Sequence, residues 1–360
     1  MNILQLASGT GLNGAIRHCY DLSCQLASRG HKVWVAHKPN GWIATQPLPP
    51  NMKLIESSLR RDREELSRLA SIAVQLEIDI LHTHNSSSHF FGVLLARFFG
   101  LRVVATCHMP HLQPHWWWND RIIAPTRSTE AFQRWVNWVP RSRIDVIPNF
   151  VDANRLKPIR TQSDTRQELG LESDDFVLSV VGEVCSRKSQ HTLIQSLPEL
   201  ISSGLSPRLL LIGKIDPAYG RKCSSVIRKL GLEQNVLMLG QRSDIGDLLS
   251  VAQCVCLPSK KEVMPISLLE AMSIGLPVIA TAVGGIEECV RDGIDGFIVD
   301  RTPRAFSEGL TALARNPKLL DQMGESSRRN MELNFSPDAC VAKIEATYEA
   351  ACDYSRAVAA

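Results

Sequence analysis

The feature that most constrains the fold is an alternation of β-branched runs and helical patterns that occurs twice along the chain. Strands are predicted at residues 2–7, 31–37, 78–82, 103–107, 121–124 and 145–147, and again at residues 176–181, 208–212, 236–239, 254–257, 277–280 and 296–299. Helical patterns lie between them, for example at residues 14–29, 63–75 and 90–99. Such alternation is typical of parallel, doubly wound sheets. The sequence therefore predicts an α/β fold with two Rossmann-like domains.

A turn-rich segment from Pro148 to Pro158, followed by a polar stretch at residues 161–164, separates the two series and is typical of a linker. A chain of 360 residues is also too long for one ordinary core. We therefore predict an N-terminal domain at residues 1–155 and a C-terminal domain at residues 156–336.

The end of the chain is predicted to be helical, because apolar residues recur at helical spacing from Pro337 to Ala351. We expect the segment 337–360 to pack back on the N-terminal domain. In a pair of doubly wound domains the carboxyl ends of both sheets face a central cleft, and ligands of this architecture bind there.

The composition, with 44% hydrophobic and 21% charged residues, is that of a soluble globular chain. Residues 1–7 lack the basic leader of a signal peptide, and the apolar stretch 90–105 is interrupted by Arg97 and Arg102. Ten cysteines occur without a C-x-x-C pair, which is typical of small buried side chains in a reducing compartment. We expect a cytoplasmic protein at the inner face of the membrane.

A glycine motif, Gly9-x-Gly11-x-x-Gly14, lies between a predicted strand and a helix. A nicotinamide dinucleotide site would need an acidic residue at the end of the second strand, and that strand ends in His37-Lys38. Lys38 would suit a 2′-phosphate, but no tyrosine is followed by a lysine four residues later, as in short-chain reductases. The motif therefore indicates a helix N-terminus that can approach a diphosphate rather than a dinucleotide site.

Two carboxylates eight residues apart mark the strongest candidate site. Glu262 follows the strand predicted at residues 254–257, whereas Glu270 falls about one turn into a helix that Pro265 can begin and Gly275 can end. The free amides of that helix can bind an anion, and the carboxylates can accept hydrogen bonds from sugar hydroxyls. A nucleotide-diphosphate sugar needs both. The alternative is a surface loop with an exposed Glu262 and a Glu270 paired to a lysine.

This segment resembles the E-x7-E motif of family-four (group 1) glycosyltransferases of the GT-B fold. Other segments of the chain also resemble family motifs, and they occur in the order that the family has. They lie at residues 13–17, 26–33, 79–84, 103–108, 146–152, 182–188, 284–285 and 292–296. The resemblance implies a retaining transferase that moves a hexose or N-acetylhexosamine from a UDP- or GDP-sugar. The implied acceptor is a glycan or a lipid-linked sugar in cell-envelope polysaccharide synthesis.

The resemblance also implies roles for residues of the C-terminal domain. Glu270 is expected to hold the donor's ribose hydroxyls, and Glu262 to contact the hydroxyls of the transferred sugar. Lys188 is expected to neutralise the leaving diphosphate, and Gly182, at the start of the same loop, is expected to lie in the donor-binding site. The backbone that lines the sugar and the diphosphate is expected at Met264, Pro265, Ile266 and Ser267.

In the N-terminal domain the resemblance implies that Gly14 presents its amide to the diphosphate. His108 is expected near the reacting sugar, as a catalytic group together with Glu262 and Lys188. His82 and His84, at the end of a predicted strand, are expected to have structural roles.

Glu183 departs from the family's pattern, which has an arginine directly after the glycine that Gly182 matches. A carboxylate repels a diphosphate. Either Arg187 substitutes for the missing arginine as a donor-binding group, or Glu183 points away and Lys188 acts alone.

The resemblance implies no obligatory metal or other cofactor, and no D-x-D triplet follows a predicted strand. The sequence is also compatible with two alternatives to a transferase. A nucleotide-sugar epimerase of the same architecture would need no acceptor, and a non-catalytic nucleotide-sugar binding protein would tolerate Glu183.

Five of the seven tryptophans lie at residues 116–138, interleaved with arginines, in a part of the chain where residues 1–155 contain 17 Lys and Arg against 11 Asp and Glu. Packing in the core is one interpretation of these tryptophans. An acceptor platform or a peripheral membrane contact is the other, because Trp suits sugars and bilayer interfaces and Arg suits anionic lipid. We expect no nucleic-acid partner, since no nucleic-acid-binding fold accompanies the charge.

Overall fold

The structure, a computed structural model, describes residues 1–60 and 62–359, with side chains as far as Asp353. These residues form two compact units, one made of Met1–Phe150 with the helix that starts at Pro337, and one made of Val151–Ser336. The division therefore falls at Phe150 rather than at residue 155. Residues 151–155 belong to the second unit because the Val151 N–H donates to the Phe335 carbonyl, 3.0 Å away.

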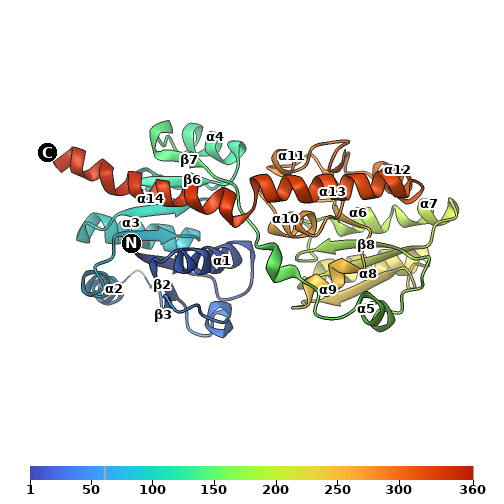
Figure 1. Ribbon diagram of the computed structural model, residues 1–360, viewed down its shortest axis with the longest axis horizontal. Helices are drawn as coiled ribbons and strands as arrows, with labels where there is room; N and C mark the ends of the chain where they lie inside the picture. Colours follow the sequence, from blue (N-terminus) through green and yellow to red (C-terminus); the bar gives the residue numbers. More distant parts are fainter. Residues whose placement is uncertain (61, 360) are drawn as a thin grey trace. The chain divides into compact units, whose positions relative to one another are not determined.

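The first unit contains a parallel seven-stranded sheet in the order β3-β2-β1-β4-β5-β6-β7. Figure 1 labels its strands β2, β3, β6 and β7. Its strands are β1 (Asn2–Ala7), β2 (Lys32–His37), β3 (Met52–Glu56), β4 (Ile80–Thr83), β5 (Val103–Thr106), β6 (Arg121–Ala124) and β7 (Ile144–Val146). Its helices are α1 (Gly14–Ser28), α2 (Arg63–Gln75), α3 (Ser86–Phe99), α4 (Arg127–Trp135), α14 (Pro337–Ala359) and the 3-10 turns η1 (Trp42–Thr45), η2 (Pro114–Trp118) and η3 (Arg141–Arg143).

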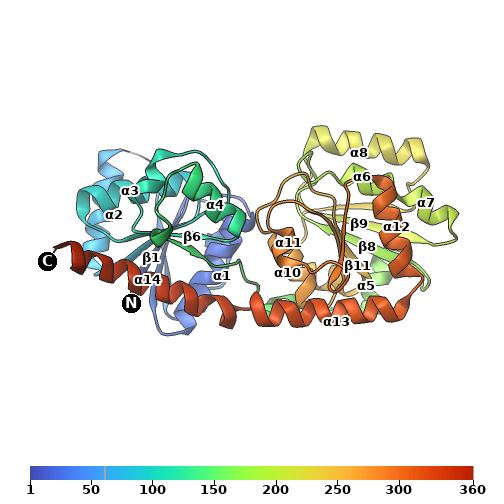
Figure 2. The ribbon, with the colours of Figure 1, turned by 90° about the horizontal axis from the view of Figure 1, so that it is seen from above.

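Helix α14 packs on the first unit, beside α1 and the strands β5 and β6 (Figure 2). Its buried side chains Ile344 and Tyr348 join the core formed by α1 and the sheet. The Tyr348 hydroxyl lies 2.6 Å from Nδ1 of His82 on β4, which ties the helix to the centre of the sheet.

The second unit contains a parallel six-stranded sheet in the order β10-β9-β8-β11-β12-β13. Its strands are β8 (Phe176–Val181), β9 (Pro207–Ile212), β10 (Val236–Gly240), β11 (Cys254–Leu257), β12 (Val278–Thr281) and β13 (Gly296–Val299). Its helices are η4 (Ala153–Leu156), α5 (Gln162–Glu168), α6 (Gln190–Ile194), α7 (Leu197–Ser202), α8 (Pro217–Leu230), α9 (Ile245–Ser250), α10 (Ile266–Ser273), α11 (Ile286–Cys289), α12 (Pro303–Ala314) and α13 (Pro317–Asn334).

Helices cover both faces of the second sheet, with α8 on one side and α13 on the other (Figure 2). Successive residues of β8 enter different cores, since Val177 packs with α10 and α13 whereas Leu178 packs with α8 and α12. This alternation is the reason that the strand is an unbroken apolar run. The two sheets confirm the predicted α/β class with two Rossmann-like domains.

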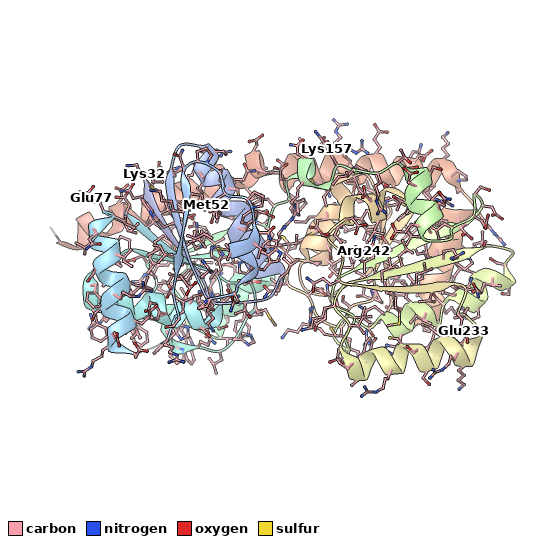
Figure 3. The ribbon with its side chains drawn as sticks, turned by 90° about the horizontal axis from the view of Figure 1, so that it is seen from below. Lys32, Met52, Glu77, Lys157, Glu233 and Arg242 are labelled. Atoms are coloured by element: carbon pink, nitrogen blue, oxygen red, sulfur yellow. The ribbon has the colours of Figure 1, made fainter. Side chains whose placement is uncertain are left out.

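One strand and one helix depart from the predictions. The edge strand β3 pairs with β2, with Met52 opposite Val33, and Figure 3 labels Met52 and the neighbouring Lys32. This strand was not predicted, because its sequence Met-Lys-Leu-Ile-Glu is only partly apolar. The polar stretch at residues 161–164 is not a linker but the start of α5, where the Thr161 hydroxyl caps the Asp164 N–H.

Candidate active site

The predicted site residues of the second unit lie where the sheet's connections change direction. From β8 the chain continues to β9 and β10 on one side, and later returns to β11 on the other. Loops that leave neighbouring strands in opposite directions open a crevice at the carboxyl ends of those strands, which is where doubly wound folds bind ligands. Gly182 follows β8 directly, and the loop with Glu262 follows β11.

Lys188 and Glu262 meet at this edge of the sheet. The Lys188 ammonium Nζ lies 2.8 Å from Glu262 Oε1, and the two side chains are only 9% and 6% exposed. The Arg187 guanidinium approaches the same oxygen at 3.2 Å, from a more exposed position. Two cations therefore face one carboxylate, which leaves one positive charge among these three groups.

The backbone fixes the two loops against each other. The Lys260 N–H donates to the Arg187 carbonyl at 2.8 Å, and Arg187 Nη1 donates to the Lys261 carbonyl at 3.1 Å. Gly182 has a φ of 141°, and a side chain at that position would lie 3.3 Å from Lys188 Cε. Glycine therefore allows the Lys188 side chain to lie along the end of β8.

Gly284 supports the Glu262 loop from the other side. It has a φ of 61°, and a Cβ added there would lie 1.9 Å from the Glu262 carbonyl oxygen. The next residue, Gly285, donates its N–H to the Val263 carbonyl at 2.6 Å. The sequence indicated a turn at Gly284 but not this contact, which depends on a tertiary approach between two loops.

Glu270 lies in the first turns of α10, as predicted, with its carboxylate Oε1 2.7 Å from Arg155 Nη2. Its partner is thus an arginine from the segment after β7 rather than the lysine of the alternative interpretation. Pro265 is the N-cap of α10 and not part of its first turn. Arg155 is a residue that the sequence reasoning missed, because a basic side chain in a turn-rich segment gives no indication of its distant partner.

The backbone expected to line the donor surrounds the N-terminus of α10. Met264 and Pro265 are buried, and Ile266 and Ser267 are half-buried. The first amides of a helix have no intrahelical acceptor, and they point toward the positive end of the helix dipole. This part of the site can therefore bind an anion, beside a carboxylate that can accept hydroxyl hydrogen bonds.

Glu183 is exposed, and its side chain forms no ion pair within residues 1–60 and 62–353. Its carbonyl accepts a hydrogen bond from Gln190 Nε2 at 2.9 Å, so the backbone there is held in place. Arg187 contacts Glu262 in this structure, at 3.2 Å.

The other two predicted site residues, Gly14 and His108, belong to the first unit. Gly14 is the first residue of α1, whose N-cap Asn13 accepts from the Ile16 N–H at 3.1 Å. His108 follows β5, and its Nε2 lies 3.3 Å from Nδ1 of His84. Burial lowers the pKa of His108 well below its usual range, so its ring is neutral at neutral pH.

His82 and His84 are fully buried. His82 contacts the Tyr348 and Thr106 hydroxyls, which agrees with a structural role. His84 Nε2 lies 2.6 Å from Gln5 Oε1.

The tryptophan segment does not form a single core-facing surface. Trp116 is buried, but Trp135 and Trp138 are 71% and 72% exposed, and Trp117 and Trp118 are exposed as well. Packing in the core therefore accounts for Trp116 only. In the part of the chain that the structure describes, no helix is both long and apolar enough for a bilayer span.

Two family models match the chain. "Glycosyltransferase Family 4" matches residues 12–155, and "Glycosyl transferases group 1" matches residues 161–330. The chain is 27% identical over 317 residues to the UDP-Gal:alpha-D-GlcNAc-diphosphoundecaprenol alpha-1,3-galactosyltransferase of Escherichia coli, which covers 81% of this chain and 80% of that one. It is 24% identical to the N-acetyl-alpha-D-glucosaminyl L-malate synthase of Bacillus anthracis, over 94% of this chain and 93% of that one.

Solved structures show the same fold. The Anabaena protein HepE in complex with UDP and glucose superposes with a TM-score of 0.85 at 21% identity, over 97% of this chain and 99% of that one. A glycosyltransferase from Rickettsia africae superposes with a TM-score of 0.87 at 18% identity, over 97% and 98% of the two chains.

Proposed function

Because the chain belongs to the group 1, family-four glycosyltransferases of the GT-B fold, we propose that it transfers a hexose or N-acetylhexosamine with retention. The donor is a nucleotide-diphosphate sugar such as a UDP- or GDP-sugar. The acceptor is a glycan or a lipid-linked sugar of cell-envelope polysaccharide synthesis. The observation that supports this most is the buried contact of Lys188 with Glu262 beside the N-terminus of α10.

In this proposal the contact between Lys188 and Glu262 is the resting arrangement of two donor-binding groups. A diphosphate carries more negative charge than one carboxylate, so it competes for the Lys188 ammonium when the donor binds. Arg187 then remains beside Glu262 and compensates its charge, while Glu262 accepts hydrogen bonds from the sugar hydroxyls. In this role Arg187 compensates the charge of Glu262. It does not take the place of the family's arginine, where this chain has Glu183.

The leaving diphosphate develops negative charge as the glycosidic bond breaks. Lys188 and the first amides of α10, near Ile266 and Ser267, stabilise that charge. We propose that these groups do so without an obligatory metal. The contributions of Gly14 and His108 follow from the family resemblance alone.

Glu270 holds the ribose of the donor in this proposal. Its contact with Arg155 fixes the carboxylate before the donor arrives, so less side-chain entropy is lost on binding.

We propose a peripheral membrane contact at the cytoplasmic face through the exposed tryptophans and the neighbouring arginines. An E. coli relative is named for a diphosphoundecaprenol-linked acceptor, which agrees with a lipid-linked substrate. Trp135 and Trp138 have the exposure that an interfacial contact needs.

Glu183 favours a second candidate function, a nucleotide-sugar binding protein without transfer activity. An assay with UDP-, GDP- and ADP-sugars, with and without glycan and lipid-linked acceptors, separates the candidates. Transfer or donor hydrolysis with one sugar nucleotide supports the transferase. Saturable donor binding without turnover supports the binding protein, and free epimerised sugar or nucleotide would indicate an epimerase.

A further inference from the structure

Three histidines converge in the first unit, at the place where its connections change direction. His84 follows β4, His108 follows β5, and His18 lies on α1. One nitrogen from each ring lies within 4.8 Å of the other two, and this is the one such cluster of His, Cys, Asp or Glu found in the described residues.

The spacing of the rings suits one metal ion that is bound by all three histidines. His84 Nδ1 and His108 Nε2 are 3.3 Å apart. Two histidine nitrogens bound to zinc at about 2.0–2.1 Å in tetrahedral geometry are separated by about 3.3–3.4 Å. The His18 ring centroid lies 5.9 Å from that of His84 and 5.1 Å from that of His108, so the third ring is near enough to complete a three-nitrogen face.

The hydrogen bond with Gln5 determines which ring nitrogen of His84 carries the hydrogen. The partners of metal-ligating histidines determine the tautomer in the same way. The Gln5 Oε1 can only accept, so His84 Nε2 donates its hydrogen at 2.6 Å. In a neutral ring the lone pair is then on Nδ1, the atom that faces His108. Metal-ligating histidines usually have such a partner on the opposite nitrogen.

His18 supplies a second, independent observation. Its Nδ1 is buried and has no hydrogen-bond partner among residues 1–60 and 62–353, and its side chain is almost fully enclosed, with the residue 2% exposed. A buried polar nitrogen without a hydrogen-bond partner destabilises the folded state, so its presence needs an explanation.

We propose that His18, His84 and His108 bind a borderline transition-metal cation of the Zn²⁺ class, with the three histidine nitrogens as protein ligands. Three imidazoles without a carboxylate suit Zn²⁺ and its neighbours rather than Mg²⁺ or Ca²⁺, which prefer oxygen. The ion connects α1 to the ends of β4 and β5. The proposed transfer reaction needs no metal. The cluster shares His108 with that reaction, so the metal site is tested by binding alone.

The full-length chain, stripped with EDTA, is titrated with Zn²⁺ against a chromogenic chelator, and with Co²⁺ while the visible absorption is recorded. We expect one Zn²⁺ per chain and the intense visible Co²⁺ bands of a four-coordinate site. His18→Ala should weaken Zn²⁺ binding at least about 10-fold and remove those bands, and Gln5→Ala should weaken binding about 10- to 100-fold. The exposed His111 is the matched control, and His111→Ala should bind as the wild type does.

The wild-type chain decides the outcome even if a variant fails to fold. No saturable binding by the wild type, or equal affinity in a folded His18→Ala, would overturn the proposal and leave a metal-free hydrogen-bonded cluster. Because no donor is present in the titration, failure here leaves the proposed transferase activity untouched.

Discussion

The Lys188 ammonium lies 2.8 Å from Glu262 Oε1, although the two residues come from loops after different strands of the second sheet. The Gly182 backbone makes room for the lysine, and Gly284 makes room for the glutamate loop. The contact thus depends on three loops at one sheet edge, and each loop can be tested separately.

Gly284→Ala should disable the site more than it destabilises the fold. The new methyl group would collide with the Glu262 carbonyl oxygen, 1.9 Å from its ideal position, and push the Glu262 loop away. Gly293 is a matched control, because its φ of 72° is similar to the 61° of Gly284 but its added Cβ meets nothing within 4 Å. Both variants should lose about 1–2 kcal/mol of stability from backbone strain. Only Gly284→Ala should lose most of its transfer rate, and equal rates in the two variants would contradict this role.

Glu270→Ala should raise the donor KM, because the ribose loses its acceptor. Loss of a hydrogen bond to a charged group costs about 1.5–3 kcal/mol, or about 10- to 150-fold in donor affinity. Glu325→Ala, which removes an exposed glutamate on α13, serves as the control.

Arg155→Ala tests whether that arginine acts through Glu270, which lies 2.7 Å from it. It should raise the donor KM in the wild-type background and add little in the Glu270→Ala background. Donor titrations of the two single variants and the double variant measure this coupling. Additive losses would show that Arg155 acts independently.

The stability of the first unit should fall in mild acid. Burial lowers the pKa of His89 to about 3, whereas the unfolded histidine has a pKa of about 6.5. The unfolded chain therefore binds the extra proton between these values. The stabilisation is complete above about pH 6.5 and is lost by about 1.4 kcal/mol per pH unit for each such histidine as the pH falls through this window.

Thermal unfolding of the metal-free chain at pH 7 and pH 5 measures this effect. His89→Gln can still bond to Thr83, whose hydroxyl lies 2.7 Å from His89 Nδ1, and should reduce the pH dependence. A melting temperature that is unchanged from pH 7 to pH 5 would contradict the expected cost of charging buried histidines.

The exposed tryptophans predict binding to anionic vesicles. Wild-type protein should float with vesicles that contain phosphatidylglycerol at low salt and be released at high salt. Trp135→Ser with Trp138→Ser should reduce flotation. Leu333→Ser, at a 66% exposed apolar residue of the second unit, should not. Flotation that is unaffected by the tryptophan changes would leave them without a membrane role.

The sequence predicted the parallel sheets because their buried strands are short, unbroken β-branched runs, such as β8 and β11. It also predicted that Glu262 and Lys188 belong to one site, through the spacing of family motifs. It could not predict Arg155 as the partner of Glu270, or the approach of Gly284 to Glu262, since both contacts join residues distant in sequence. The sequence could not predict the exposure of Trp135 either, because helical spacing alone does not indicate which face of α4 is covered.

The most direct test of the proposed function is the rate of sugar transfer by Lys188→Ala compared with the wild type and with Lys260→Ala, an exposed lysine of the neighbouring loop. Circular dichroism should first establish that both variants are folded. If Lys188 stabilises the leaving diphosphate, Lys188→Ala should lower kcat about 100- to 1,000-fold, as for the loss of other groups that stabilise developing charge, while Lys260→Ala stays near the wild-type rate. A kcat near the wild-type value in folded Lys188→Ala would contradict the proposed mechanism.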